Sequence, residues 1–209
     1  VKAGLDILLT DCNNLFTRDW FLPTGDLRDM KSSYKRAHVI IVTKCKPDLS
    51  IEEKENIIRE IDPLPHQHVF FTSIVYGSLY HIVTNEKKQI DDNIEVLLVS
   101  GIANPKPLKK YLSDNAETYY EMSYSDHHIF SIDDWKDIRK RFDGIPSDNK
   151  IILTTEKDAV RLKKFEQSLG AYPFYVVPIQ VEFLFEEERR FTEIIGKFIS
   201  GFKNKKEEA

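Results

Sequence analysis

Seven short apolar runs constrain the fold of this chain more than any other feature of its sequence. They are rich in β-branched and aromatic residues, which is typical of buried strands. Helical patterns lie between most of them, and strands that alternate with helices predict an α/β fold with a largely parallel sheet. The expected strands cover residues 6–11, 38–44, 68–74, 94–100, 117–123, 150–156 and 173–179.

The helical patterns begin at recognisable capping residues. Ser50 can cap the first of them, and Ser131 and Thr155 are each followed three residues later by an aspartate, which resembles a capping box. We therefore expect helices over 51–61, 105–115, 131–142, 155 to about 167, and about 186–202.

The stretch 68–92 departs from this alternation. Two strand-like halves meet near Tyr76 and Gly77, so we expect an antiparallel two-stranded linker there. It would separate residues 1–67, the remainder of one lobe, from a C-terminal α/β lobe over 93–209. The sequence opens with valine and moves almost at once into a strand-like run, so we expect it to be part of a longer protein.

Charge and cysteine content exclude some classes of function. The chain has 30 basic and 34 acidic residues, a formal charge of −4, and no basic block, so we expect no nucleic-acid partner. Cys12 and Cys45 form neither a disulfide framework nor a C-x-x-C pair, and buried thiols in a reducing compartment are the simplest interpretation. No apolar run is long enough to span a bilayer.

The segment LPTGDLRD (22–29) can bind an anion. Gly25 favours a turn, Asp26 can cap a short helical segment after it, and Arg28 would then project from the first turn beside free backbone amides. An arginine in that position can hold a phosphate through paired hydrogen bonds. The alternative is a surface turn in which Arg28 pairs with Asp26 or Asp29.

Two further segments follow strands directly. In VSGIANPKP (99–107), Gly101 allows a tight turn and Asn104 can cap the next helix, at the strand end where open α/β sheets place ligands. In TTEKDAV (154–160), Lys157 can reach an anion. From these residues alone, a plain strand-to-helix connection for the first segment and a structural helix cap for the second are the better explanations.

The triplet Asp126-His127-His128 has three interpretations. A histidine beside a carboxylate can act in proton transfer or steady a partner carboxylate. A metal site would need further ligands, and the neighbouring residues are mostly tyrosines and serines. The third interpretation is a loop after the strand at 117–123, with His127 satisfied locally.

Taken together and in this order, these segments resemble the tetraacyldisaccharide 4′-kinases of lipid A biosynthesis. Each motif is modest alone, whereas five or six at appropriate distances are specific. The matching stretches are LLTD (8–11), LPTGDLRD (22–29), VIIVTK (39–44), GIANP (101–105), SDHHIF (125–130) and TTEKDAVRL (154–162).

The resemblance implies transfer of the γ-phosphoryl group of ATP, with Mg²⁺, to the 4′-hydroxyl of a tetraacyl glucosamine disaccharide 1-phosphate, giving lipid IVA. It implies a peripheral enzyme at the cytoplasmic face of the bacterial inner membrane. The implied fold is a P-loop kinase core, here its remainder over 1–67, plus a smaller C-terminal lobe. This chain has no G-x-x-x-x-G-K-[ST] segment and lacks the family's metal-binding aspartate pair, so we expect it to be inactive alone.

The resemblance also assigns roles to single residues. Arg28 matches an arginine that approaches the transferring phosphate, and Asp29 matches an acidic neighbour that is usually glutamate. Asp126 and His127 match a catalytic aspartate-histidine pair, while the family tolerates other residues at His128, so His127 is the preferred candidate.

The same motifs supply further candidates for substrate or phosphate binding. Besides Asp29, these are Gly25, Asn104 and Lys157; no metal ligand is assigned within this chain.

Two other functions remain open from the sequence. A class of metal-dependent phosphoesterases is also named after the triplet DHH, and these enzymes need a two-metal site built with aspartates from other strands. Alternatively, the α/β lobe could be a binding module without catalytic activity.

Overall fold

A computed structural model describes residues 4–207 of the chain. The described residues divide into two compact units. Residues 4–75 with 181–207 form unit 1, and residues 76–180 form unit 2. Each unit is described by itself.

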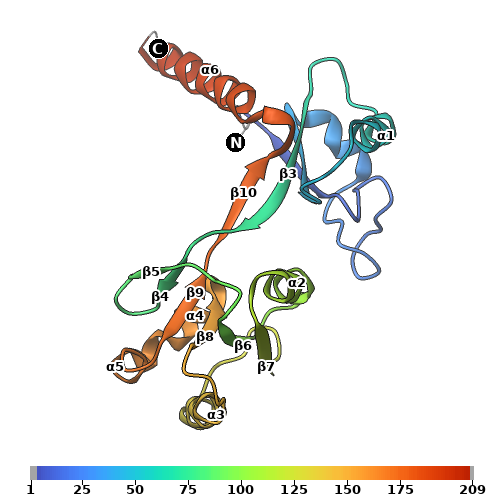
Figure 1. Ribbon diagram of the computed structural model, residues 1–209. Helices are drawn as coiled ribbons and strands as arrows, with labels where there is room; N and C mark the ends of the chain where they lie inside the picture. The colour runs from blue at the N-terminus through green and yellow to red at the C-terminus, as the bar shows by residue number, and fades with distance from the viewer. Residues whose placement is uncertain (1–3, 208–209) are drawn as a thin grey trace. The chain divides into compact units, whose positions relative to one another are not determined.

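Unit 1 is built on a four-stranded sheet with the order β1-β2-β3-β10. β2 is parallel to both β1 and β3. Figure 1 shows β3 and β10 side by side and running in opposite directions. The strands are β1 (Ile7–Asp11), β2 (Val39–Cys45), β3 (His68–Tyr76) and β10 (Ile179–Phe183).

Helices cover both faces of this sheet. On one face Ile57 and Ile58 of α1 (Ile51–Ile61) pack against a cluster that includes Ile40, Val42 and Phe71. On the other, Phe191 and Ile194 of α6 (Glu188–Glu207) pack against Val39, Ile41 and Phe70. Two short 3₁₀ helices complete the unit, η1 (Lys31–Arg36) and η3 (Leu184–Glu186).

Unit 2 contains a six-stranded sheet with the order β5-β4-β9-β8-β6-β7. Its strands β9, β8, β6 and β7 are parallel, with β7 at one edge, and the antiparallel strands β4 and β5 form the other edge. The strands are β4 (Leu79–His81), β5 (Lys87–Lys88), β6 (Glu95–Ser100), β7 (Thr118–Ser123), β8 (Lys150–Thr155) and β9 (Phe174–Val177).

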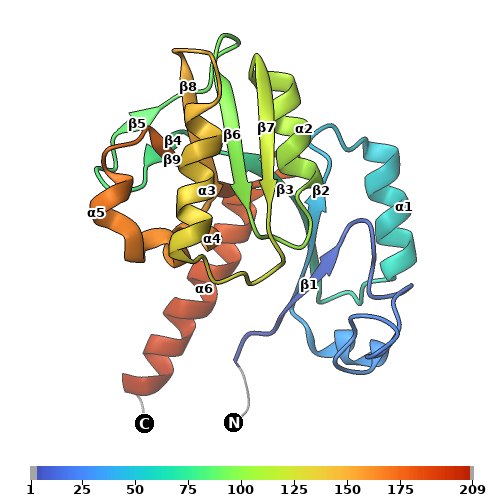
Figure 2. The ribbon, with the colours of Figure 1, turned by 90° about the horizontal axis from the view of Figure 1, so that it is seen from below.

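Successive side chains of β6 point to opposite layers of helices. Figure 2 shows α3 and α2 flanking the strands β8, β6 and β7. Leu97 and Val99 face a core that includes residues of α3, α4 and α5, whereas Val96 and Leu98 face α2. Both faces are therefore covered, as a parallel sheet requires. The helices are α2 (Lys106–Asn115), α3 (Ile132–Asp143), α4 (Glu156–Leu162), η2 (Lys163–Phe165) and α5 (Glu166–Leu169).

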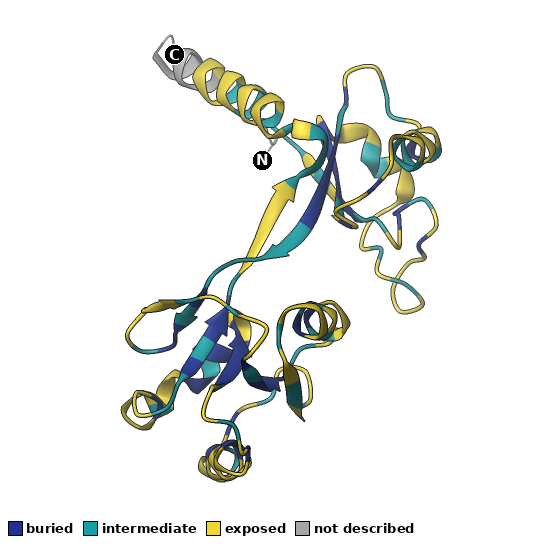
Figure 3. Cartoon of the chain, viewed as in Figure 1, coloured by how far each residue is buried: buried dark blue, intermediate teal, exposed yellow. Residues whose placement is uncertain are grey.

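The α/β class and the seven expected strands are confirmed within a residue or two at each end. The local capping signals are confirmed as well. Ser50 and Ser131 each form a full capping box, and the Thr155 hydroxyl accepts a hydrogen bond from the amide of Asp158. Figure 3 shows that the central strands are the most buried part of each sheet, while β10 and α6 are largely exposed.

The organisation of the chain differs from the expected division at 67 and 93. The two halves of 68–92 do not pair with each other: β3 joins β2 and β10, while β4 pairs with β5 and β9. The C-terminal segment from 181 belongs to unit 1, because α6 covers an apolar face of its sheet. A sequence pattern shows which face of a strand or helix is apolar, but it does not show which other strand or helix packs against that face.

Within the described part of the chain, no helix is both long and apolar enough to cross a membrane.

Candidate functional site

The loop between Asp19 and Leu27 in unit 1 folds around one carboxylate. Asp19 is only 8% exposed, and its carboxylate accepts hydrogen bonds from the amides of Trp20 (2.7 Å) and Asp26 (3.2 Å). The amide of Leu27 donates to the carbonyl of Trp20, which closes the loop. A Cβ atom at Gly25 would lie 2.3 Å from that same carbonyl oxygen, so only glycine fits at this position.

The backbone near Arg28 differs from the expectation. The helical segment starts at Lys31 with Met30 as its N-cap, so Asp26 caps no helix and Arg28 does not lie in a first turn. The amide of Asp26 is already used by Asp19, which makes this stretch a continuation of the loop.

Arg28 makes neither of the ion pairs considered from the sequence. Asp29 instead accepts hydrogen bonds from the Met30 amide and the Arg36 guanidinium, and these bonds, the Met30 bond foremost, lower the pKa of its carboxyl group. Arg28 itself is exposed and has no hydrogen-bonding or ionic partner within residues 4–207. Its guanidinium is therefore available to a ligand.

Arg28 and Asp29 both line a cavity of about 360 Å³ in unit 1. Apolar side chains of β1 and of the loop before η1 form much of its wall, and Arg36 lies at the same cavity. An apolar cavity with a few convergent charged groups is a common form of ligand site.

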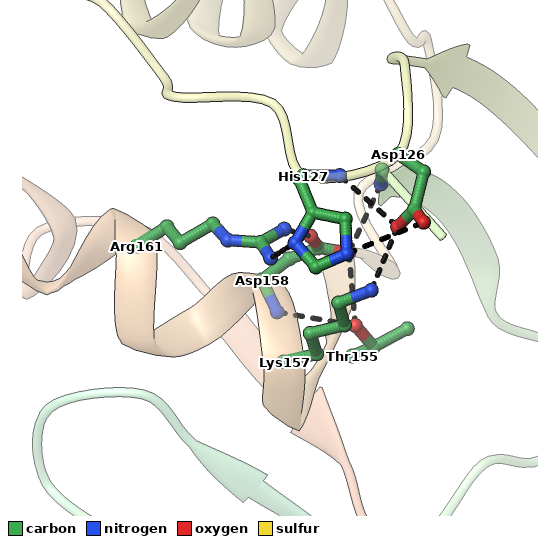
Figure 4. Close-up of polar contacts among 7 residues, drawn as sticks. Asp126, His127, Thr155, Lys157, Asp158 and Arg161 are labelled. Atoms are coloured by element: carbon green, nitrogen blue, oxygen red, sulfur yellow. Dashed lines mark hydrogen bonds and ion pairs between the residues drawn. The ribbon is translucent and has the colours of Figure 1, made fainter. Parts of the chain in front are cut away.

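In unit 2, the motifs GIANP (101–105), SDHHIF (125–130) and TTEKDAVRL (154–162) meet where the parallel strands end, at the carboxyl-terminal edge of the sheet. β6, β7 and β8 are neighbours in parallel register, with Ser100 opposite Ser123 and Val99 opposite Thr154. Their carboxyl ends therefore lie together, and the loops that follow them converge. We call the group of residues that meets there the edge cluster: Gly101, Asp126, His127, Thr155, Lys157, Asp158 and Arg161 (Figure 4).

Asp158 is the fixed centre of the edge cluster. Its side chain is fully buried, and its carboxylate accepts from the amide of Gly101 (3.0 Å) and the hydroxyl of Thr155 (2.9 Å). Its second oxygen pairs with Arg161 at 3.1 Å. A Cβ atom at Gly101 would lie 3.0 Å from the carbonyl oxygen of Ser125, so the loops after β6 and β7 approach closely.

Asp126 forms an ion pair with Lys157, which lies in the first turn of α4. The ammonium group of Lys157 lies 2.7 Å from Oδ1 of Asp126, and this bond is the main reason why the pKa of the carboxyl group is lowered. Lys157, which the sequence suggested as an anion ligand, therefore already has an internal partner.

His127 is the exposed member of the triplet. Its side chain is 72% exposed, and its backbone has a φ of 64°, a conformation that non-glycine residues seldom adopt. The His127 amide donates to Asp126 (3.0 Å), Nε2 lies 3.5 Å from Oδ2 of Asp126, and Nδ1 lies 3.1 Å from Nη2 of Arg161. Strained, exposed and supported by charged neighbours, it has features that are common among functional residues.

His128 has a different environment. Nε2 lies 3.0 Å from Oδ2 of Asp134, the N3 residue of the α3 capping box, and the ring stacks on Tyr124 with centroids 4.6 Å apart. Its side chain is 27% exposed. His128 thus ties the loop to the start of α3.

Asn104 closes the turn before α2. Its Oδ1 accepts a hydrogen bond from the amide of Lys106, the first residue of the helix, and Pro105 stands at the N-cap. The expectation that Asn104 is the N-cap is therefore wrong: Pro105 is the N-cap and no side chain caps the helix, while Asn104 forms an i to i+2 turn just before it.

Arg161 is the residue of the edge cluster that the sequence analysis missed. It stands three residues after Asp158 on a predicted helix, a spacing that can signal an ion pair. Its contact with His127, 34 residues away along the chain, had no signal in the sequence.

A model of the family LpxK, tetraacyldisaccharide-1-P 4′-kinase, matches residues 1–200. A tetraacyldisaccharide 4′-kinase of Phocaeicola vulgatus is 35% identical over 206 residues, which are 95% of this chain and 56% of that protein. One of Parabacteroides distasonis is 38% identical over 207 residues, with the same coverage. The chain thus spans just over half the length of these relatives.

A solved structure has the same fold. It is the crystal structure of the "apo" form of LpxK from Aquifex aeolicus in complex with ATP, with a TM-score of 0.60 and 21% identity. The alignment covers 94% of this chain and 53% of that one. Because the family model matches nearly the whole chain and relatives above 30% identity cover it almost fully, the chain belongs to the tetraacyldisaccharide-1-phosphate 4′-kinase family.

Proposed function

We propose that the protein to which this chain belongs transfers the γ-phosphoryl group of ATP to the 4′-hydroxyl of a tetraacyl glucosamine disaccharide 1-phosphate, giving lipid IVA. Its acceptor is a lipid, so we place it as a peripheral protein at the cytoplasmic face of the inner membrane. Family membership supports the reaction class, and the arrangement around His127 is the observation that carries the proposal.

The edge cluster suits a reaction in which negative charge moves. Phosphoryl transfer depends mainly on positioned charges and hydrogen-bond donors. The ring of His127 is exposed to solvent, and its backbone amide donates to Asp126. Lys157 pairs with Asp126, and Arg161 contacts the ring of His127. In this proposal Asp126 and His127 act at the reacting groups.

Arg28 would act on the transferring phosphate. Its guanidinium is exposed and unpaired within residues 4–207, and a planar guanidinium can bind two phosphate oxygens at once. We place Asp29, Gly25, Asn104 and Lys157 in supporting roles. Asp29 orients Arg36 at the cavity rim, and Gly25 permits the loop that carries Arg28.

We include Mg²⁺ in the proposed reaction only because the resemblance to the kinase family implies it. Among the side chains of residues 4–207 that the structure describes, no group of three or more His, Cys, Asp or Glu could hold a metal ion. These residues do not fit a magnesium site by themselves, and none of the roles above passes through the metal.

The decisive experiment compares two adjacent histidines in the full-length protein. We expect His127→Asn to lower kcat for phosphate transfer from labelled ATP to the lipid acceptor by at least about 100-fold, the lower end for loss of a hydrogen-bond donor that stabilises the transition state. His128→Asn is the matched control. It should lower thermal stability, because it breaks the contact with Asp134, while kcat changes far less.

Equal losses of kcat in the two variants, with both proteins folded by circular dichroism, would contradict the assignment of His127.

Two measurements address the other functions raised by the sequence. Tight stoichiometric binding of Mn²⁺ by calorimetry would favour a phosphoesterase. A protein that binds ATP and acceptor without turnover would be a binding module.

A further inference from the structure

The edge cluster contains a cation, Arg161, that contacts a ring nitrogen of His127. Nη2 of Arg161 lies 3.1 Å from Nδ1 of His127, and Nη1 of the same guanidinium lies 3.1 Å from Oδ1 of Asp158. Figure 4 shows the guanidinium next to the imidazole of His127 and the carboxylate of Asp158. Arg161 therefore bridges the exposed histidine to the fixed centre of the cluster.

Arginine has five N–H donors and no acceptor, and it keeps its proton at any accessible pH. A hydrogen bond between Arg161 and His127 consequently requires that Nδ1 of the imidazole carries no proton. The neutral ring must then carry its proton on Nε2, the nitrogen that lies 3.5 Å from Asp126. A doubly protonated ring is incompatible with the contact.

Arg161 is itself held firmly. Its side chain is 21% exposed, and its partner Asp158 is completely buried and bonded to Gly101 and Thr155. The position of the guanidinium is thus set, through Asp158, by the ends of β6 and β8. Such fixed outer partners orient functional imidazoles and select their tautomer.

We propose that Arg161 is a positioning residue that holds His127 in the Nε2–H tautomer, so that Nε2, which lies 3.5 Å from Oδ2 of Asp126, is the ring nitrogen that can donate a hydrogen bond to an anionic partner. The partner is a carboxylate or a phosphoryl oxygen at the site proposed above, and this inference rests on that proposed function. In this arrangement His127 orients and stabilises a negative group, and the abstraction of the hydroxyl proton falls to another base.

The first test reads the tautomer directly and needs no activity. In NMR spectra of the ¹⁵N-labelled chain, imidazole nitrogens with and without a proton have well-separated ¹⁵N chemical shifts. The signals of His127 are assigned as those that disappear in the variant His127→Asn. Spectra are recorded at about pH 8.5, roughly two units above the ordinary histidine pKa of about 6.5. We expect the wild-type ring to be almost entirely Nε2–H.

Three variants separate positioning from general stability. Arg161→Met removes the donor and should raise the Nδ1–H fraction of His127. Arg161→Lys restores a cationic donor and should recover the wild-type ratio in part. Lys163→Met removes an exposed cation two residues away and should leave the ratio unchanged. Circular dichroism and melting temperatures establish that each variant is folded.

The second test uses the full-length protein. Arg161→Met should lower kcat by about 10- to 100-fold, the usual cost of losing an orienting partner, with a smaller change in KM for ATP. Arg161→Lys should recover part of that loss, and Lys163→Met should match the wild type.

Each outcome distinguishes the two proposals. An Nδ1–H tautomer in the wild type, or a ratio that Arg161→Met leaves unchanged, would overturn the positioning role. So would a changed ratio with an unchanged kcat in an active full-length protein. A wild-type full-length protein without phosphate transfer would instead refute the proposed function, while the tautomer measurement would still decide what Arg161 does to His127.

Discussion

Gly25 shows how one residue determines the shape of the loop that carries Arg28. A side chain there would meet the Trp20 carbonyl oxygen at 2.3 Å and Oδ1 of Asp19 at 2.4 Å. Neither atom can move without breaking the hydrogen bonds that close the loop. We expect Gly25→Ala to lower the free energy of unfolding by about 1–3 kcal/mol, the usual cost of overpacking, as measured by urea denaturation.

The control for this variant is Gly196→Ala in α6. A Cβ atom at Gly196 meets nothing within 4 Å, and alanine stabilises an exposed helix position by roughly 0.5–1 kcal/mol relative to glycine. The two alanine substitutions should therefore have opposite signs. Destabilisation by both would indicate that the close contact at Gly25 is not the cause.

Tyr124 gives the molecule a predictable response to alkali. Burial, with the added charges of Asp134 and Asp137, raises the pKa of its phenol to about 12, above the ordinary value of about 10. The stabilising contribution of the neutral phenol is complete below about pH 10 and is lost as the pH rises towards 12. We expect the melting temperature of Tyr124→Phe to fall less across this range than that of the wild type.

Tyr119→Phe, which leaves Tyr124 in place, is the control and should follow the wild type. If all three proteins lose the same stability between pH 10 and 12, Tyr124 does not contribute to the alkaline transition.

At the level of elements, the start of α3 anchors the loop that carries His127. The carboxylate of Asp134 accepts hydrogen bonds from the Ser131 amide (2.6 Å) and hydroxyl (2.8 Å) and contacts His128 at 3.0 Å. We expect Asp134→Ala to cost about 1–2 kcal/mol of unfolding free energy, as loss of a helix cap does, measured in urea.

Asp133→Ala provides the comparison within the same helical turn. The side chain of Asp133 is 84% exposed, and its ion pair with Lys136 lies on the surface, so we expect a change within about 0.5 kcal/mol. A similar cost for the two substitutions would show that charge at the helix start matters, rather than the specific hydrogen bonds of Asp134.

At the level of the whole molecule, we expect the 209-residue chain by itself to have no kinase activity. Its sequence contains no G-x-x-x-x-G-K-[ST] segment, the segment with which P-loop enzymes hold the β- and γ-phosphates of ATP. The measurement is turnover of Mg-ATP and the lipid acceptor by the chain, with the full-length protein as control. A thermal-shift titration with ATP should also show little stabilisation, because a ligand stabilises only the state it binds. Turnover above background would refute this expectation.

Much of the local structure was predictable because its causes are local. Ser50 and Ser131 cap their helices through residues only three positions away, and strands such as β6 are identified by their own composition. The site was predictable only in part. Parallel strands place GIANP, SDHH and TTEKD at one edge, but neither the Arg161–His127 contact nor the unpaired state of Arg28 could be derived from spacing.

The sequence by itself determined seven of the strands, the helix starts at Ser50, Ser131 and Thr155, and the kinase family, since these depend on periodicity, on hydrogen bonds between near neighbours and on motifs in order. The tertiary structure alone decided which elements are partners. It placed β3 between β2 and β10, assigned α6 to unit 1, and made His128 a structural residue while leaving His127 exposed. The physical reason is that these outcomes depend on contacts between residues distant in the chain, where several apolar faces or charges of similar strength compete for one partner.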